Sequence, residues 1–253
     1  MMTTTINKTI SLKKKKANLA SVDVFVYCSG KCGSSTLYST FIKNKYDALH
    51  IHNNHQFQEY VIQSTHHTIF DVIDHNASRK QMIYIIDSYR TPIERKISSF
   101  FQNLRKHVPN YRTTSIDELI TIFNKSFLTT LEEYHSIEEA LRHYQLPNWS
   151  SFDFDKKYNI QQKGNLVFIK IRFHDINQWD KILSNIFQTP IKIFSSNLSG
   201  GKQYDTLYQA FKLAYHVPDT YLKTHLVNDK NFKIYNTEQE QTSYLKKWGK
   251  TIE

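Results

Sequence analysis

The feature that most constrains the fold is a short apolar run that passes through a glycine-containing loop into an amphipathic segment. Residues 22–28 (VDVFVYC) are apolar enough for a buried strand, and residues 34–46 place their apolar side chains on one face of a helix. The loop between them, residues 29–36 (SGKCGSST), is rich in glycine and hydroxyl groups. A buried strand that leads through such a loop into a helix is typical of α/β domains that bind anions at this turn.

The same alternation continues along the chain, which at 253 residues is long enough for one α/β domain with its own core. Further strands are predicted at 47–52, 58–65, 81–90, 165–173 and 191–196. Further helices are predicted at 69–80, from Pro92 onward, twice within 115–146, after 174, at 204–226 and at 237–248. This order predicts an α/β fold with a central parallel sheet covered on both faces, in a P-loop-like three-layer sandwich.

The predicted organisation is a flexible tail at residues 1–20 followed by a single domain at residues 21–253. The middle of the chain, at about residues 112–160, is interpreted as an all-helical insertion. No signal-peptide core is visible, and no stretch approaches the ~18 apolar residues of a membrane span. We therefore expect a cytoplasmic protein.

The composition indicates which kinds of ligand the protein is suited to bind. Lys and Arg total 33 against 23 Asp and Glu, and this net charge of +10 favours anionic ligands, although Lys13–Lys16 supply four of the charges. The two cysteines, Cys28 and Cys32, are spaced C-x3-C without a second pair, so neither a disulfide framework nor a zinc site is predicted. Reduced thiols are expected.

The loop at residues 29–36 is a predicted anion site. Free N–H groups at the start of a helix and the helix dipole favour a negative group, and Gly33 lets the backbone approach it closely. Lys31 precedes that glycine, whereas the ordinary P-loop, G-x-x-x-x-G-K-[ST], places its lysine after the last glycine. An ordinary turn rich in glycine and serine fits the composition equally well.

A second pattern, RTPIERKIS, follows the strand at 81–90. Arg90 ends that strand, and Arg95 and Ser98 lie three residues apart on the helix that follows. The forked guanidinium of Arg90 can bind a phosphate that Ser98 also reaches. Taken singly, the two arginines also fit a strand-end cap and an ion pair of Arg95 with Glu94 or Asp87.

Together, these two motifs resemble the sulfotransferase superfamily that uses 3′-phosphoadenosine 5′-phosphosulfate (PAPS). The stretch Lys31–Thr36 is similar to the family's 5′-phosphosulfate loop, and Arg90–Ser98 is similar to its 3′-phosphate motif, with the same spacing of eight. More loosely, most of residues 22–250 resembles a bacterial branch named for capsular polysaccharide synthesis. Thr91 and His174 depart from the acidic residues that relatives often carry at these positions.

The resemblance implies that a sulfuryl group is transferred from PAPS to a hydroxyl of a small-molecule natural product or a saccharide, leaving 3′,5′-adenosine bisphosphate (PAP). The displacement would be in line, with a histidine base and no metal; the histidines lack the spacing of a metal motif. The cofactor-binding residues implied are Lys31, Cys32, Gly33, Ser34, Ser35, Thr36, Arg90, Ser98, Lys202 and Tyr204. A glycine-rich turn before a helix explains Lys202 and Tyr204 equally well.

The candidate catalytic residues are Lys31, which would stabilise the charge that develops on the leaving phosphate, and a histidine that would act as the base. We rank His66 first, His67 second and His52 third, with His50 and His55 near the last of these in sequence. The chain has 12 histidines, so any single one can equally be structural.

Three other functions compete with this hypothesis. A P-loop kinase or NTPase is disfavoured by the position of Lys31 and by the lack of an obvious Mg²⁺-binding aspartate other than Asp87. A nucleic-acid-binding protein would suit the net charge of +10 and 14% aromatic residues, but the aromatics lie mostly at predicted core positions, and we expect no nucleic-acid partner. The third alternative is a PAPS-binding protein without activity.

Overall fold

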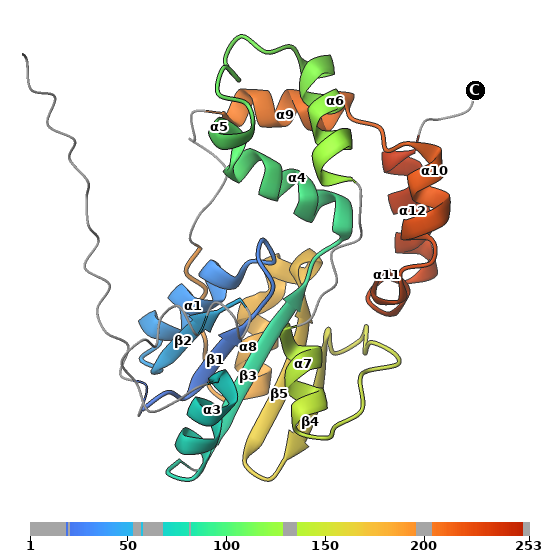
Figure 1. Cartoon of the computed structure of the whole chain (residues 1–253). Coiled ribbons are helices and arrows are strands. Elements are labelled where there is room, and N and C mark those ends of the chain that lie inside the picture. The colour runs from blue at the N-terminus through green and yellow to red at the C-terminus, as the bar shows by residue number, and fades with distance from the viewer. Residues whose placement is uncertain are drawn as a thin grey trace, which may run out of the picture.

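The protein is an α/β fold built on one five-stranded sheet (Figure 1). The computed structural model describes residues 19, 21–52, 57, 68–80, 82–128, 136–195 and 204–249. The strand order is β2-β1-β3-β5-β4; β4 runs antiparallel to β5, and the other neighbours are parallel. The strands are β1 (Val24–Tyr27), β2 (Ala48–Ile51), β3 (Ile83–Tyr89), β4 (Tyr158–Lys163) and β5 (Leu166–Arg172). The predicted α/β fold is thus confirmed, although the sheet, predicted to be parallel, has one antiparallel strand, β4.

Helices cover both faces of the sheet, which makes three layers (Figure 1). Side chains of successive strand residues point to opposite faces, so Phe25 and Tyr27 pack with one set of helices and Val24 and Val26 with the other. The first set is α3 (Ile69–Ala77) and α7 (Ser136–His143), and the second is α1 (Ser34–Lys43) and α8 (Trp179–Phe187). Burial of both faces explains why the parallel strands are apolar along most of their length.

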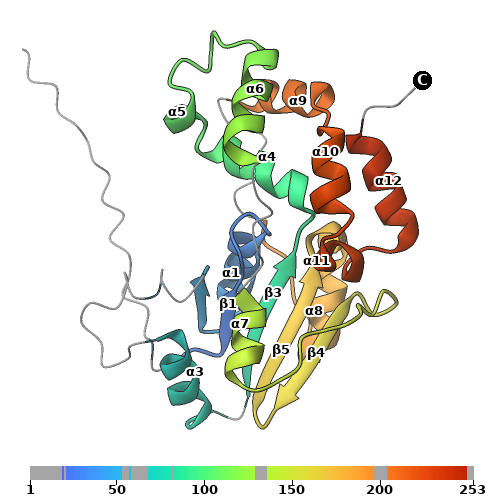
Figure 2. The same ribbon diagram turned by 45° about the vertical axis from the view of Figure 1, so that its right-hand side comes forward.

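The remaining helices gather beyond the carboxyl ends of the parallel strands, where they form what we call the helical region (Figures 1 and 2). Its core is largely aromatic and includes Phe100, Phe123, Phe211 and Trp248. The helical region consists of α4 (Pro92–Gln102), α5 (Leu104–His107), α6 (Ile116–Phe127), α9 (Asp205–Ala214), α10 (Asp219–Tyr221), the π-helix η2 (Leu222–Leu226), α11 (Lys230–Ile234) and α12 (Glu238–Trp248). A 3-10 segment, η1 (Phe173–Gln178), joins β5 to α8.

The all-helical interpretation of residues 112–160 was wrong at its end. After α6 and α7 the chain turns into β4, which pairs with β5 through a two-residue hairpin turn at Gly164 and Asn165. Gly164 has a φ of 58°, the left-handed conformation that such a turn requires.

Two further predictions were wrong. Residues 191–195 form no strand, because their N–H groups bond to side chains beside α1 and α8; Ile191, for example, donates to Ser184 Oγ at 2.8 Å. The helix predicted at 204–226 is interrupted before Pro218, whose ring disfavours a helical conformation in the preceding residue. The predicted strand at 58–65 lies outside the described residues, as does nearly all of the predicted tail.

Across the described part of the chain, no helix combines the length and the apolar character needed to cross a bilayer.

One carboxylate joins α12 to the start of α4. Glu94 accepts hydrogen bonds from the Tyr244 hydroxyl, from Lys247 Nζ at 3.0 Å, from Trp248 Nε1 at 3.2 Å and from Thr91 Oγ1 at 2.8 Å. Because Tyr244 and Trp248 are buried, their polar atoms depend on this acceptor.

We expect Glu94→Ala to lower the free energy of unfolding by about 3 kcal/mol, because it leaves buried donors without a charged acceptor. Urea unfolding measures this loss. Glu238→Ala, at an exposed position at the start of α12, is the control and should cost no more than about 0.5 kcal/mol. Equal losses in the two variants would contradict the role given to Glu94.

Candidate functional site

The candidate site lies where the sheet changes direction. The chain leaves β1 toward β2 on one side and returns to β3 on the other side of β1. The connections after β1 and β3 therefore diverge, and in open α/β sheets ligands bind in the crevice that this leaves at the carboxyl ends of the strands. Both motifs found in the sequence lie at this crevice, one after each strand.

The loop after β1 has the backbone geometry of an anion site. Lys31 and Gly33 both have positive φ, 69° and 85°, so the chain curls before α1 begins. Gly33 caps the helix, and its carbonyl accepts from the N–H of Thr36 at 2.9 Å. Within the described residues, the N–H groups of Cys32, Gly33, Ser34 and Ser35 have no hydrogen-bond acceptor. These four consecutive donors are what an anion at a helix N-terminus needs.

Two arginines hold the carbonyl side of this loop. Arg90 donates from Nη1 to the carbonyl oxygen of Lys31, and Arg95 donates from Nε to that of Gly30, both at 3.0 Å. In a trans peptide the N–H points opposite to the C=O, so the N–H of Cys32 points away from Arg90. The Arg90 guanidinium and the N–H of Cys32 therefore lie on opposite sides of the loop.

The side chains of Lys31 and Cys32 lie apart from the loop amides. Lys31 Nζ donates to Gln102 Oε1 of α4 at 2.6 Å. Cys32 is fully buried against Tyr89 and Tyr235, and burial raises the pKa of its thiol to about 11. Cys32 thus offers a ligand its backbone and not a thiolate.

The histidine pair at the end of β2 lies beside the loop. His52 Nδ1 is 2.8 Å from the carbonyl oxygen of Cys28. A carbonyl only accepts, so neutral His52 carries its proton on Nδ1 and its lone pair on Nε2. The ring of His50 lies 4.7 Å from that of His52, and burial together with this neighbour lowers the pKa of His50 to about 4.

Arg90 also lines a pocket on the far side of the loop. Its guanidinium lies 4.5 Å above the ring of Phe173, at the end of β5. The pocket has a volume of about 510 Å³ and is lined by residues at the ends of β3 and β5 and on helix α12. Its walls include Phe173, His174, Tyr235, Glu240 and Lys247.

Two further predicted cofactor residues, Ser98 and Tyr204, lie on or against α4. Ser98 is half-buried on α4, one turn after Glu94. The ring of Tyr204 lies 5.9 Å from that of Phe101, the residue before the partner of Lys31. The structure thus places Lys31, Ser98 and Tyr204 around one helix, α4.

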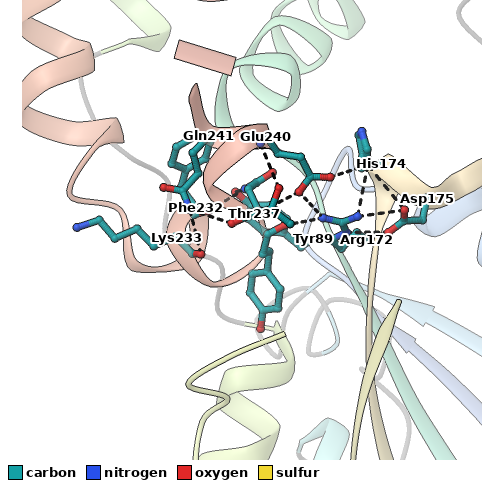
Figure 3. A network of polar contacts seen from close by, with 11 residues as sticks. Tyr89, Arg172, His174, Asp175, Phe232, Lys233, Thr237, Glu240 and Gln241 are labelled. Carbon is teal, nitrogen blue, oxygen red and sulfur yellow. Dashed lines mark hydrogen bonds and ion pairs between the residues drawn. The ribbon is translucent and has the colours of Figure 1, made fainter. Parts of the chain in front are cut away.

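A second arginine of the pocket wall, Arg172, lies within a network of polar contacts (Figure 3). Arg172 donates to both carboxylate oxygens of Asp175, at 2.7 and 3.1 Å, and to Glu240 Oε2 at 2.8 Å. Glu240 also completes the capping box of α12 with Thr237. His174 is exposed and lies 3.4 Å from Glu240 Oε1. This network joins β5 to α12.

Buried charges lie at the ends of β3 and β5. Lys170 Nζ is 2.7 Å from Asp87 Oδ2 and 3.0 Å from Glu138 Oε1, and the other oxygen of Asp87 accepts from the N–H of Ser88 at 2.7 Å. Burial opposes the charge on Lys170, but the two carboxylates outweigh it and hold its pKa well above the usual value. Both oxygens of Asp87 are occupied, so it is poorly placed to bind Mg²⁺. Elsewhere in the described residues, no group of three or more His, Cys, Asp or Glu residues could hold a metal ion.

Four histidine and lysine candidates, His55, His66, His67 and Lys202, lie outside the described residues. Sequence reasoning missed the contacts of Arg95 with the loop and the charges of β5. The strand LVFIKIR carries a detectable signal, because Lys170 and Arg172 interrupt a buried apolar strand and must find partners.

Comparisons with protein-family models, with curated proteins and with solved structures found no match.

We expect Gly33→Ala to destabilise the protein by about 2–4 kcal/mol, from left-handed strain and overpacking. A Cβ at Gly33 would lie 2.7 Å from Trp179 and 2.9 Å from Phe173. Gly30→Ala is the matched control, because its Cβ would meet nothing within 4 Å. Denaturant unfolding of the two variants measures the difference, and similar losses would contradict the predicted packing.

Below neutral pH, His50 should make stability pH-dependent. The unfolded chain takes up this proton near pH 6.5, whereas the folded protein does so only near pH 4. Stability is therefore retained above pH 6.5 and lost as the pH falls, by up to about 2 kcal/mol between pH 7 and pH 5.

Urea unfolding at these two pH values checks this loss, which His50→Gln should remove. His216→Gln, at an exposed position, should keep the pH dependence of the wild type. If His50→Gln lost as much stability between pH 7 and pH 5 as the wild type, His50 would not be the source of the pH dependence.

Proposed function

We propose that this protein is a PAPS-dependent sulfotransferase that transfers a sulfuryl group to a hydroxyl of a small-molecule natural product or a saccharide. The observation that carries the proposal is the loop after β1. Its amides from Cys32 to Ser35 lack acceptors within the described residues, while Arg90 and Arg95 hold its carbonyls. This geometry suits an anionic group bound by backbone N–H groups.

The placement of Arg90 favours a ligand with two separate anionic groups. An anion on the Cys32 amide lies on the opposite side of the loop from the Arg90 guanidinium. A single phosphate is therefore poorly placed to use both, whereas PAPS carries a 5′-phosphosulfate and a 3′-phosphate. In the proposal, residues 32–36 bind the first group, and Arg90 with Ser98 binds the second.

The protein's own groups have distinct roles in the proposed reaction. PAPS supplies the sulfuryl group. Lys31 moves its ammonium from Gln102 to the leaving phosphate and stabilises the charge that develops there, a contribution commonly worth ~10²–10³ in rate. His52 accepts the proton of the acceptor hydroxyl on Nε2, because Nδ1 is held by the Cys28 carbonyl. His66 and His67 remain alternative bases.

Binding of PAP tests the proposal. We expect PAP to raise the melting temperature, since a ligand at ~100 times its dissociation constant adds about 2.7 kcal/mol to stability. AMP should give a smaller rise, and ATP·Mg²⁺ should give none beyond that of AMP. Differential scanning fluorimetry measures these shifts.

Arg90→Ala should abolish the rise in melting temperature with PAP, whereas Arg142→Ala, exposed on α7, should leave it unchanged. No rise with PAP, or a rise only with ATP·Mg²⁺, would overturn the proposal, and the latter would favour a kinase.

Once an acceptor is identified, His52→Gln should lower kcat by ~10²–10⁴ and leave the rise in melting temperature with PAP intact. An unchanged kcat would exclude His52 as the base.

A further inference from the structure

Cations from three parts of the chain lie in or near the pocket beside Arg90. Arg90 follows β3, Lys247 lies near the end of α12, and Lys212 lies on α9. Arg90 and Lys247 both line the pocket. Residues so distant in sequence meet here only because the helical region folds over the carboxyl ends of the strands (Figure 2).

Tyr208 connects Lys212 to Arg90. Lys212 Nζ lies 4.5 Å above the Tyr208 ring, and the positive charge of Arg90 acts on the same tyrosine, where it opposes the burial that raises the Tyr208 pKa. Tyr208 in turn packs on Phe101 of α4, with ring centres 5.1 Å apart. Phe101 lies three residues after Ser98, on the same side of the helix. Lys212 is therefore close to the two residues proposed to bind a phosphate.

The cations are only partly neutralised. Lys247 is 3.0 Å from Glu94 Oε1, but Glu94 also accepts from Thr91, Tyr244 and Trp248. Half-buried Lys212 has no carboxylate within ion-pair distance among the described residues.

Burial lowers the pKa of Lys212, and the charges of Lys247 and Arg90 lower it further. The carboxylates of Glu94 and Asp205 offset this repulsion only in part, so the excess positive charge favours a bound anion.

We propose that Lys212 and Lys247, together with Arg90, bind the second phosphate of a nucleotide whose first anionic group lies on the loop at residues 29–36. This inference rests on the proposed function and extends it, because it assigns phosphate recognition to two residues of the helical region that neither sequence motif contains. The ligand would thereby connect the sheet to α9 and α12.

Isothermal titration calorimetry with PAP and AMP tests the proposal. Lys212→Gln should weaken PAP binding about tenfold, and Lys247→Gln about three- to tenfold, because each removes a charge-assisted contact to the second phosphate. AMP, which lacks that phosphate, should bind each variant as it binds the wild type. Lys212→Arg keeps the charge and should restore most of the affinity for PAP.

Lys223→Gln is the matched control, because Lys223 is an exposed lysine of the same helical region and should not affect PAP binding. Thermal unfolding of each variant verifies that it is folded. Equal weakening of PAP and AMP, or unchanged PAP binding in both Lys212→Gln and Lys247→Gln, would overturn the proposal.

Failure of the sulfotransferase proposal has a different signature, since the wild type itself would then not bind PAP. In that case, the proposed anion site at Lys212 and Lys247 is tested by measuring the binding of tripolyphosphate instead. Weaker binding by Lys212→Gln and Lys247→Gln than by Lys223→Gln would support the site, and equal binding by all three would overturn it.

Discussion

The candidate site depends on two hydrogen bonds to the loop after β1, one from Arg90 just before α4 and one from Arg95 on α4. Arg90 and Arg95 each donate to a loop carbonyl at 3.0 Å. These donors satisfy the carbonyls of Gly30 and Lys31. The same bonds place α4 beside the loop, and with it Gln102, the partner of Lys31. One pair of arginines therefore holds the loop against the beginning of the helical region.

Elsewhere in the molecule, charged side chains also join elements that are distant in the sequence. Glu94 joins α4 to α12, the pair Arg172 and Glu240 joins β5 to α12, and Lys170 joins β5 to β3 and α7. Each of these charges is partly or fully buried, where an unpaired charge is costly. The arrangement fixes the relative positions of the sheet and the helical region more specifically than apolar contacts alone, and the pocket lies between two of these connections.

The sequence predicted the elements well wherever the local signal was strong. The strands that became β1, β3 and β5, the proline at the start of α4 and the capping box at Thr237 all appear as expected. The predictions failed where local patterns compete with tertiary contacts. Residues 191–195 have the apolar character of a strand, yet their N–H groups bond to Asn44 and Ser184, which no local pattern reveals. The hairpin between β4 and β5, by contrast, has a local signal in the dipeptide Gly164-Asn165.

The sequence by itself determined that the chain alternates strands and helices and that two polar motifs follow strand ends, because apolar periodicity and turn residues act locally. It also identified the loop, Arg90 and Ser98 as one group of candidates. Only the tertiary structure decided that Arg90 contacts the carbonyl of Lys31, that Asp87 is paired with Lys170, and that Arg90 and Lys247 meet in the wall of one pocket. These contacts join residues up to 157 positions apart in the printed sequence, from Arg90 to Lys247. Such distances are closed by the packing of the helical region over the sheet, and no pattern of neighbouring residues encodes them.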